Sequence, residues 1–457
     1  VLNDLPLNSE FLGCTDIRAS NYDASVPYSN GSCEYVAVVC SACDHVLEPD
    51  EFLLDNNELG LNPGAVIGIR GGGERTNVLI RNFNADVEGG EEPFIFVNCD
   101  GKAFLKNENS ADLFAVRRSS GLRITGTGSP SDAFGFDING GKVSGFRAYD
   151  RTDNIEVDHL EVFNTSIGIW CVTRPTCDGS ANRGNYVQEN TEIHHNYVHD
   201  VQDEGFYIGG SKWLIGFDNN GCAGEKLYQP DLIGVKVYNN RVESTGWDGI
   251  QVGGAVKDCE IHHNIIFNYG IEEQLSQQAG IMINPGTVGK IFANHVNNGT
   301  GIAIHATGFD NLIYSNLIEN IKSDGVVLGD RGPFPDKSYR VVNNTFVNLE
   351  GAAFKSNSQE SVNNVFYNNL MINVAEDPRF FEKNTETSNN VVTKTSESLF
   401  LIKSSNDDYT PGMESDLLDS GFVYTREDID IDFFSRKRNV GARLDIGAFE
   451  NQEADDQ

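Results

Sequence analysis

Acidic side chains stand directly before short glycine-led segments in the middle of the chain. Asp203 and Glu204 precede Gly205-Phe-Tyr-Ile, and Asp248 precedes Gly249-Ile-Gln-Val. If the two segments stack as neighbouring strands, the carboxyl groups of Glu204 and Asp248 should lie roughly 5 to 7 Å apart. A carboxylate pair at that separation can act as acid and as nucleophile or base on a glycosidic bond. Asp203 would add a third negative charge and raise at least one pKa.

Polar, aromatic and basic side chains gather around these acids. His199 lies a few residues upstream and is expected to donate to a sugar oxygen or to tune a pKa. Groups that could stack on or pair with a sugar come from the outward positions of the glycine-led segments, from the three tryptophans and from two flanking insertions. We therefore expect substrate contacts from Asp137, Trp170, Arg174, Arg183, Tyr207, Lys212, Trp213, Trp247 and Gln251.

A structural role is the alternative for some of these groups. Asp324 also precedes a glycine-led segment, Gly325-Val-Val-Leu, although no second acid adjoins it there. An Asp or Glu before glycine is a common turn former. The catalytic and the turn-forming roles of Glu204 and Asp248 therefore both remain open.

The acids and their neighbours belong to an internal repeat. A short β-rich phrase that ends in Asn returns roughly every 22 to 30 residues. Between these phrases lie the glycine-led segments, whose period-two alternation predicts half-buried strands. Asn tolerates the left-handed turn conformation and stacks as an amide ladder, so the repeated Asn is assigned to architecture. The column contains Asn196, Asn240, Asn264, Asn294, Asn316, Asn344 and Asn369.

The repeat predicts an all-β fold, a right-handed parallel β-helix, because each rung holds short strands that pair with the next rung. No long helical pattern separates the strands, which argues against a doubly wound sheet. The predicted division is a small disulfide-containing N-terminal cap over 1–58, a β-helix over 59–450 and a flexible tail over 451–457.

Composition limits the partners. The chain has 34 Lys and Arg against 67 Asp and Glu, a formal net charge of −33, which argues against nucleic acid as a partner. No run of about 18 apolar residues is present, so no membrane insertion is expected. We expect a monomer that is secreted or held at the cell surface, in the extracellular space or the periplasm.

Nine cysteines favour an oxidising compartment and disulfides. Four of them lie near the start of the chain, and Cys171 and Cys177 bracket a short loop that could be bridged. Cys40 and Cys43 form a C-x-x-C, but no second such pair follows at zinc spacing. No metal site is therefore predicted and no cofactor is required, although the clustered acids could hold Ca²⁺.

The Gly-Ile-x-Ile strands, the Asn-ending turns and the closing Asp-Ile-Gly-Ala-Phe-Glu450 resemble the pectate-lyase-like superfamily of right-handed parallel β-helix proteins, over roughly residues 60 to 450. The resemblance implies a secreted bacterial carbohydrate-active protein. The layout of acids is most similar to β-helical glycoside hydrolases such as polygalacturonases and endo-fucanases, although the Gly-His-Gly and Arg-x-Lys signatures of polygalacturonases are absent.

Three functions remain in competition. The first is an endo-acting glycoside hydrolase that cleaves an anionic, sulfated or marine-type polysaccharide with carboxylate acid/base chemistry. The alternative is a polysaccharide lyase that acts by β-elimination on a uronate polymer, with Lys212, Arg174 or Arg183 as base. The last is a non-catalytic glycan-binding surface protein.

Overall fold

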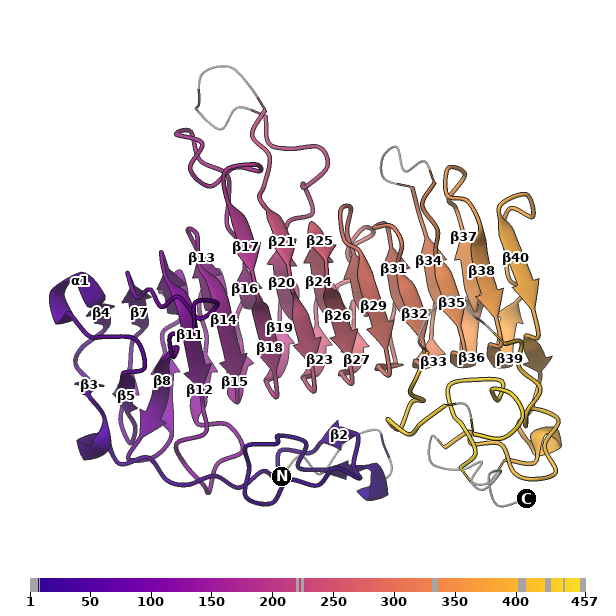
Figure 1. The fold of residues 1–457 in the computed structure, drawn as a ribbon, viewed down its shortest axis with the longest axis horizontal. Helices are drawn as coiled ribbons and strands as arrows, with labels where there is room; N and C mark the ends of the chain where they lie inside the picture. The colour runs from indigo at the N-terminus through magenta and orange to yellow at the C-terminus, as the bar shows by residue number, and fades with distance from the viewer. Residues whose placement is uncertain are drawn as a thin grey trace.

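Three long parallel sheets wind around one core in the computed structural model (Figure 1). The structure describes residues 7, 9–218, 222, 226–330, 336–401, 408–423, 429–438 and 440–452. Each rung passes from the 13-stranded sheet through an Asn turn to the 12-stranded sheet, and then to the 11-stranded sheet. The fold is a right-handed parallel β-helix, as the sequence repeat predicts.

The strands of each sheet pair only in parallel. The 11-stranded sheet contains β4 (Leu53–Asp55), β7 (Val78–Arg81), β10 (Asp112–Arg117), β13 (Ser144–Tyr149), β16 (Ile167–Cys171), β20 (Phe206–Gly209), β24 (Ile250–Gly253), β28 (Ile281–Ile283), β31 (Ile304–Ala306), β34 (Val326–Leu328) and β37 (Phe354–Ser356). The 13-stranded sheet contains β3 (His45–Leu47), β5 (Val66–Arg70), β8 (Phe94–Cys99), β11 (Ser120–Thr125), β14 (Asp153–Asp158), β18 (Thr191–His194), β22 (Lys236–Tyr238), β26 (Cys259–His262), β29 (Gly289–Phe292), β32 (Leu312–Tyr314), β35 (Arg340–Val342), β38 (Asn364–Tyr367) and β40 (Thr385–Ser388).

The third long sheet forms the remaining side of the β-helix, and a few short strands and helices lie outside the three long sheets. The 12-stranded sheet contains β6 (Glu74–Arg75), β9 (Ala103–Lys106), β12 (Phe136–Asn139), β15 (Leu160–Phe163), β19 (Tyr197–Val201), β23 (Arg241–Thr245), β27 (Ile265–Tyr269), β30 (His295–Asn297), β33 (Leu317–Ile321), β36 (Thr345–Ala352), β39 (Leu370–Glu376) and β41 (Val391–Thr393). The remaining elements are the strands β1 (Leu12–Gly13), β2 (Tyr28–Ser29), β17 (Val187–Glu189), β21 (Asp231–Ile233) and β25 (Ala255–Lys257), and the helices α1 (Asn56–Leu59), η1 (Ser9–Phe11), η2 (Cys40–Ala42) and η3 (Glu397–Leu399).

A buried amide ladder forms the turn between the 13-stranded and 12-stranded sheets. The residue before each Asn adopts a positive φ, for example 54° at His195 and 53° at His263, which bends the chain sharply. Each Asn then donates from Nδ2 to Oδ1 of the Asn in the next rung over 2.9 to 3.1 Å. The predicted column is confirmed and extends to Asn390.

Residues 9–38 run along the flank of the β-helix, on the side of the Asn turns (Figure 1). We call residues 9–38 the N-terminal strap. Tyr28 Oη lies 2.9 Å from the carbonyl oxygen of Ala293 and 3.1 Å from that of Phe433. The rings of Phe11 and Phe434 stack at 3.7 Å. The strap therefore joins a rung in the middle of the β-helix to the segment after its last strands.

Three disulfides fasten the described chain. Cys14 pairs with Cys33 inside the strap, Cys40 with Cys99, and Cys177 with Cys222. The expected Cys171–Cys177 bridge is wrong, because Cys171 points into the core and is fully buried. The Cys177–Cys222 bridge instead joins the two insertions that follow β16 and β20. Three bridges favour an oxidising compartment.

None of the helices in the described part of the chain is long and apolar enough to cross a membrane.

Candidate functional site

The outer face of the 11-stranded sheet carries one row of polar and aromatic side chains. Strand pairing aligns them in consecutive rungs as Arg147, Trp170, Tyr207, Gln251, Met282 and His305. Their chain neighbours, such as Ile169 and Phe206, point inward and are buried. Alternation along each strand thus places the row on the outside. The sequence prediction grouped Trp170, Tyr207 and Gln251 correctly.

Asp137 does not belong to this row. It lies in β12 of the 12-stranded sheet, where it pairs in register with Phe104 and Glu161. The phrase Gly135-Phe-Asp-Ile has the same pattern as the glycine-led strands, but it occupies a different side of the rung. Lys102 approaches the Asp137 carboxylate at 3.5 Å, and burial raises the pKa of Asp137.

Glu204 lies at the edge of the row, where the chain enters β20. Its side chain is only 2% exposed, and Oε1 accepts a hydrogen bond of 2.8 Å from Gln277. Burial raises the pKa of Glu204 to about 7, and the negative charge of Asp203 adds to the shift, against the hydrogen bond from Gln277. Glu204 is therefore suited to gaining or losing a proton near neutral pH.

Asp248 occupies the same position one rung later, as predicted, since its carbonyl oxygen accepts a hydrogen bond of 3.0 Å from Gly205 N. Its carboxylate, however, is fully buried, and Oδ1 accepts a hydrogen bond of 2.7 Å from Ala279 N. Asp324 makes the same contact with Ala352 N, at 2.9 Å. The two aspartates share one turn-forming role, and Asp248 presents no carboxylate to a sugar in this structure.

Asp203 directly precedes Glu204, whereas His199 lies in β19. Asp203 is half-buried and accepts a hydrogen bond from the hydroxyl of Ser166. His199 lies on the outer face of the 12-stranded sheet, 2.8 Å from Asp200 and 3.7 Å from Glu161. Burial lowers the pKa of His199, but hydrogen bonds to these two carboxylates outweigh burial and raise it overall. In this structure His199 thus pairs with Asp200 and Glu161, and its role beside Glu204 stays a prediction.

The three tryptophans have three environments. Trp170 lies in the outer row and is 7% exposed. Trp213 packs against Gly254 and Gly286, where a β-carbon would collide with its ring, and its indole N–H donates to Asp231 at 2.7 Å. Trp247 is half-buried beside Asp248. Trp213 is thus fixed as a packing residue of the insertion that follows β20.

The two insertions pack on one another through Arg183. Its guanidinium stacks on Trp213 at 4.0 Å, pairs with Asp231 at 3.3 Å and donates to the carbonyl oxygen of Gln229 at 3.2 Å. Arg183 is therefore a loop-packing residue rather than an open anion site. Lys212 is exposed and lies 5.1 Å from the ring centre of Phe217. Neither residue forms a site with Glu204 in this structure.

Sequence reasoning missed Arg147, Tyr149 and Gln277. Arg147 and Tyr149 lie on the outer face of β13, and Gln277 lies in the loop between β27 and β28. The row also continues to a cavity of about 380 Å³ that Leu275, Met282 and others line. No spacing rule singles out one Gln in a loop, because only the fold brings it to Glu204.

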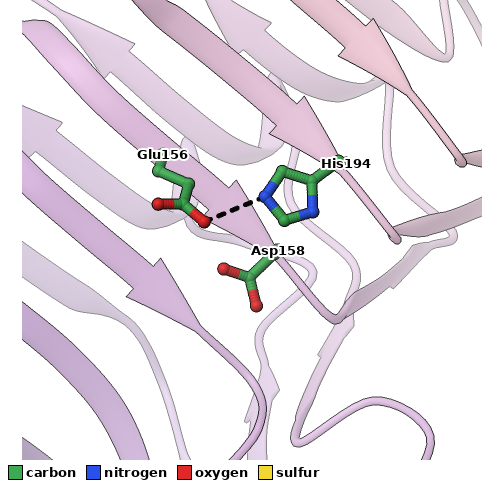
Figure 2. Close-up of side chains that lie close together, drawn as sticks. All are labelled: Glu156, Asp158 and His194. Carbon is green, nitrogen blue, oxygen red and sulfur yellow. Dashed lines mark hydrogen bonds and ion pairs between the residues drawn. The ribbon is translucent and has the colours of Figure 1, made fainter. Parts of the chain in front are cut away.

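A second group of titratable side chains lies on the 13-stranded sheet. Glu156, Asp158 and His194 present ligand-type atoms within 4.8 Å of one another (Figure 2). His194 Nε2 lies 2.9 Å from Glu156, Arg18 contacts the same carboxylate at 2.6 Å, and Arg123 lies 3.0 Å from Asp158. Because two guanidinium groups already neutralise these carboxylates, the group does not fit a metal ion.

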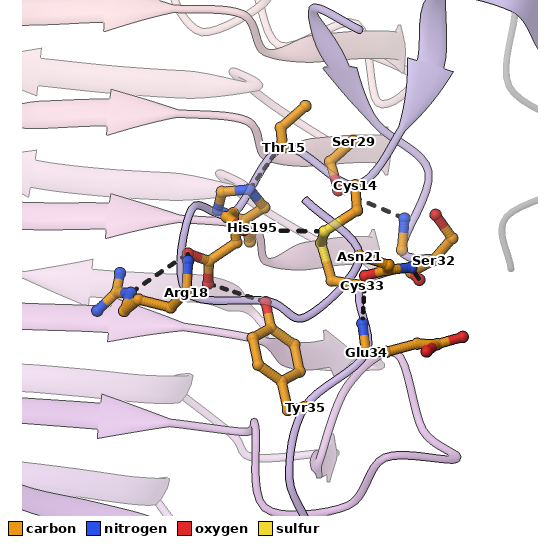
Figure 3. Close-up of a disulfide and its surroundings, with 12 residues drawn as sticks. Cys14, Thr15, Arg18, Asn21, Ser29, Ser32, Cys33, Glu34, Tyr35 and His195 are labelled. Atoms are coloured by element: carbon orange, nitrogen blue, oxygen red, sulfur yellow. Dashed lines mark hydrogen bonds and ion pairs between the residues drawn. A yellow bond between two sulfur atoms is a disulfide. The ribbon is translucent and has the colours of Figure 1, made fainter. Parts of the chain in front are cut away.

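This group is the docking point of the N-terminal strap. Figure 3 shows Thr15, Arg18 and Tyr35 of the strap gathered around the Cys14–Cys33 bridge and facing His195. His195 lies 2.7 Å from the Thr15 hydroxyl, and Tyr35 Oη lies 2.8 Å from His159. The cluster is therefore structural and is separate from the outer row of the 11-stranded sheet.

One family model matches part of the chain. Residues 227–410 match a family model described as a right handed beta helix region. The chain is similar to the crystal structure of pectate lyase Pel9A, with 14% identity, a TM-score of 0.46 and coverage of 90% of this chain and 97% of that one. It is also similar to PL6 family alginate lyase AlyGC, with 14% identity, a TM-score of 0.44 and coverage of 75% and 51%. The periplasmic alginate epimerase AlgG shows 11% identity, a TM-score of 0.37 and coverage of 75% and 84%. No curated protein matches the chain.

Proposed function

Because the chain is a right-handed parallel β-helix protein, we propose that it is an enzyme that cleaves a polysaccharide on the outer face of its 11-stranded sheet. Glu204 carries this proposal, since it is the buried carboxyl group at the edge of that face and its pKa is raised to about 7. The half-buried aromatic ring of Tyr207 on the same face suits stacking on a sugar ring. A sugar would have to displace Gln277 to reach Glu204.

The reaction that we favour is β-elimination on a uronate polymer. Glu204 would act as the base that removes the C5 proton, and the electron pair of that C–H bond would form the C4–C5 double bond. The C4–O4 bond breaks in the same reaction, and a proton from water converts the departing O4 into a hydroxyl group. A base poised near neutral pH suits that step. The burial of Asp248 supports this choice, because hydrolysis needs a second carboxylate within reach of the sugar.

Hydrolysis of an anionic, sulfated polysaccharide, as by an endo-fucanase, is the second candidate. The same raised pKa of Glu204 would let it act as the general acid, and Asp203 would be the second carboxylate. A binding protein without catalysis is the third candidate, in which the outer row would serve only as a glycan surface.

One experiment separates the three candidates. The protein is incubated with uronate polymers and with sulfated polysaccharides, while new reducing ends and the ultraviolet absorbance of an unsaturated product are followed together. Reducing ends with rising absorbance support elimination, and reducing ends without it support hydrolysis. No turnover of any polymer would contradict the proposal of an enzyme. Glu204→Gln should abolish turnover, whereas Glu272→Gln, an exposed charge-matched change in the loop of Gln277, should not.

We further propose that turnover needs no cofactor and no Ca²⁺. The acids of the site already accept hydrogen bonds from Ser166, Gln277 and the backbone of Ala279. Treatment with a chelator should leave the rate unchanged, and adding Ca²⁺ afterwards should not raise it. Loss of activity that returns with Ca²⁺ would overturn this expectation.

We propose that the protein works outside the cytoplasm, either secreted or at the cell surface. The three disulfides support that location. Its expected partner is the polysaccharide, bound by a monomer.

A further inference from the structure

The first part of the outer row is basic and aromatic. Arg117 follows Ala115 by two positions in β10 and pairs in register with Tyr149 of β13, while Arg147 pairs with Trp170 of β16. Arg174 follows β16 and places its guanidinium 5.5 Å from the centre of the Trp170 ring. We call Arg117, Arg147, Tyr149, Trp170 and Arg174 the arginine platform.

Arg147 is held rigidly at the centre of this platform. Its guanidinium carbon lies 4.4 Å from the ring centre of Tyr149 and 4.2 Å from that of Trp170. One edge of the group is fixed by Asp112, whose carboxylate accepts a hydrogen bond of 3.0 Å from Nη1. Because its rotamer is already fixed, little conformational entropy would be lost when a ligand binds.

Three buried donors of the platform lack an acceptor. Nε of Arg117, Nε of Arg147 and the indole Nε1 of Trp170 are shielded from solvent, and none has a hydrogen-bond partner among the described residues. Buried polar groups in proteins are nearly always paired. All three atoms are donors, so the group that would satisfy them is an acceptor, and an anion would satisfy them best.

The net positive charge of the platform also favours an anionic ligand. Within the described part of the chain, neither Arg117 nor Arg174 forms an ion pair, although the whole chain carries a formal charge of −33. Two uncompensated guanidinium groups beside Arg147 therefore make a local positive site in an acidic protein. Such a site attracts an anionic ligand that the rest of the surface repels.

We propose that the arginine platform binds the carboxylate of a uronate unit in the polysaccharide. This inference rests on the proposed function, because it assumes that a glycan lies along the outer row. The planar edge of a guanidinium presents two parallel N–H groups, which match the two oxygens of a carboxylate. The half-buried ring of Tyr149 lies beside the cations and adds aromatic surface next to the carboxylate site.

The platform adjoins Glu204. The carbonyl oxygen of Glu204 accepts a hydrogen bond of 3.0 Å from Gly168 N, in the strand that carries Trp170. A polymer that follows the outer row across successive rungs would therefore place one acidic unit on the platform and a nearby linkage at Glu204. The platform would set the position of the polymer, while Glu204 would act on it.

Binding is measured in the Glu204→Gln background, so that the polymer stays intact. Isothermal titration compares this protein with its Arg147→Gln and Arg174→Gln derivatives. The ligands are short chains of galacturonate, of mannuronate with guluronate, and of a sulfated galactan. Arg174 is exposed and lies 5.5 Å from the centre of the Trp170 ring, so its replacement should not disturb folding. Lys437→Gln, an exposed change of equal charge in the segment after the last strands, is the matched control.

We expect each platform variant to bind at least one uronate polymer about tenfold more weakly or worse, and the control to bind unchanged. Unchanged binding by both platform variants would overturn the inference. Preference for a sulfated galactan over both uronate polymers would also overturn it, because the platform would then be a sulfate site. If the platform variants lose binding while the wild-type chain cleaves nothing, the inference stands and the proposed enzyme does not.

Discussion

At the residue scale, the protonation of Glu204 separates the two reactions. Its pKa is raised to about 7, mainly by burial. As a base in elimination Glu204 must be ionised, so kcat/KM should rise with pH and level off above about 7. As an acid in hydrolysis it must be protonated, so kcat/KM should fall above about 7. Rates with a fixed polymer across this pH range provide the measurement.

The direction in which kcat/KM changes with pH identifies the role of Glu204. A rising limb supports elimination, and a falling limb supports hydrolysis. A limb near the ordinary pKa of glutamate, about 4.3, would show that Glu204 is solvated during turnover and would contradict the buried geometry. Glu272→Gln, which is exposed in the same region, should leave the limb in place.

A second residue-scale prediction concerns Asp248. If its carboxylate serves only the turn, Asp248→Ala and Asp324→Ala should each lower the free energy of unfolding by about 1 to 3 kcal/mol, because a backbone N–H loses its acceptor. Urea unfolding followed by circular dichroism measures this cost. Under elimination, Asp248→Ala should keep its turnover per folded molecule. Complete loss of turnover in a folded Asp248→Ala protein, with Asp324→Ala still active, would restore the paired-carboxylate mechanism.

At the element scale, the buried amide ladder should dominate the stability of each rung. Asn264 Nδ2 lies 2.9 Å from the carbonyl oxygen of Val237, and its Oδ1 accepts from Asn240. Asn264→Ala should therefore cost about 2 to 4 kcal/mol, since several buried groups lose their partners at once. Thermal and urea unfolding of the purified variant would measure this.

An exposed ladder on the 12-stranded sheet offers the matched control. Asn348 donates to Asn320 at 3.0 Å, but both side chains face solvent, and Asn348 has a φ of 54°. Asn348→Gly keeps that backbone conformation available and should cost within about 0.5 kcal/mol. Equal costs for the two variants would show that stacking of amides matters more than their burial.

The elements also mark how far sequence reasoning reaches. The Asn turns and the glycine-led strands were predictable, because each is a local pattern that recurs once per rung. Asp137 was assigned to the wrong sheet, since a glycine followed by alternating apolar residues fits any side of the rung. Arg117 and Arg147 were missed because their row runs across strands, and only the strand register reveals it.

At the scale of the whole molecule, the N-terminal strap was the feature hidden from the sequence. The contacts of Thr15, Tyr28 and Tyr35 reach residues more than a hundred positions away in the chain. The sequence predicted a cap over residues 1–58, and no local pattern encodes where such a segment docks. The sequence likewise gives only the net charge of the chain. It does not show that the carboxylates around Glu156 are paired with arginines, whereas Arg117 and Arg174 beside Arg147 form no ion pair among the described residues.

The Tyr28 hydroxyl group tests how much the contacts of the N-terminal strap stabilise the protein. Tyr28→Phe removes the hydroxyl that two buried carbonyl oxygens face, which should cost about 1 to 3 kcal/mol locally. Because a solenoid can open in parts, amide hydrogen exchange is the appropriate measurement. Exchange should accelerate in the strap and around Phe433, but not in the first rungs. Tyr22→Phe, at a side chain that is 43% exposed, should change nothing.

The contact between Tyr28 and Phe433 also determines when the strap can dock during folding. Rungs of a β-helix can form one after another as the chain emerges from a ribosome or a secretion channel, since each rung needs only its neighbour. The strap cannot close in that way, because one of its partners lies 405 positions later. The strap must therefore wait for a segment that is synthesised 405 positions after Tyr28. Until that late segment arrives, the side of the Asn turns would stay open to chaperones and proteases.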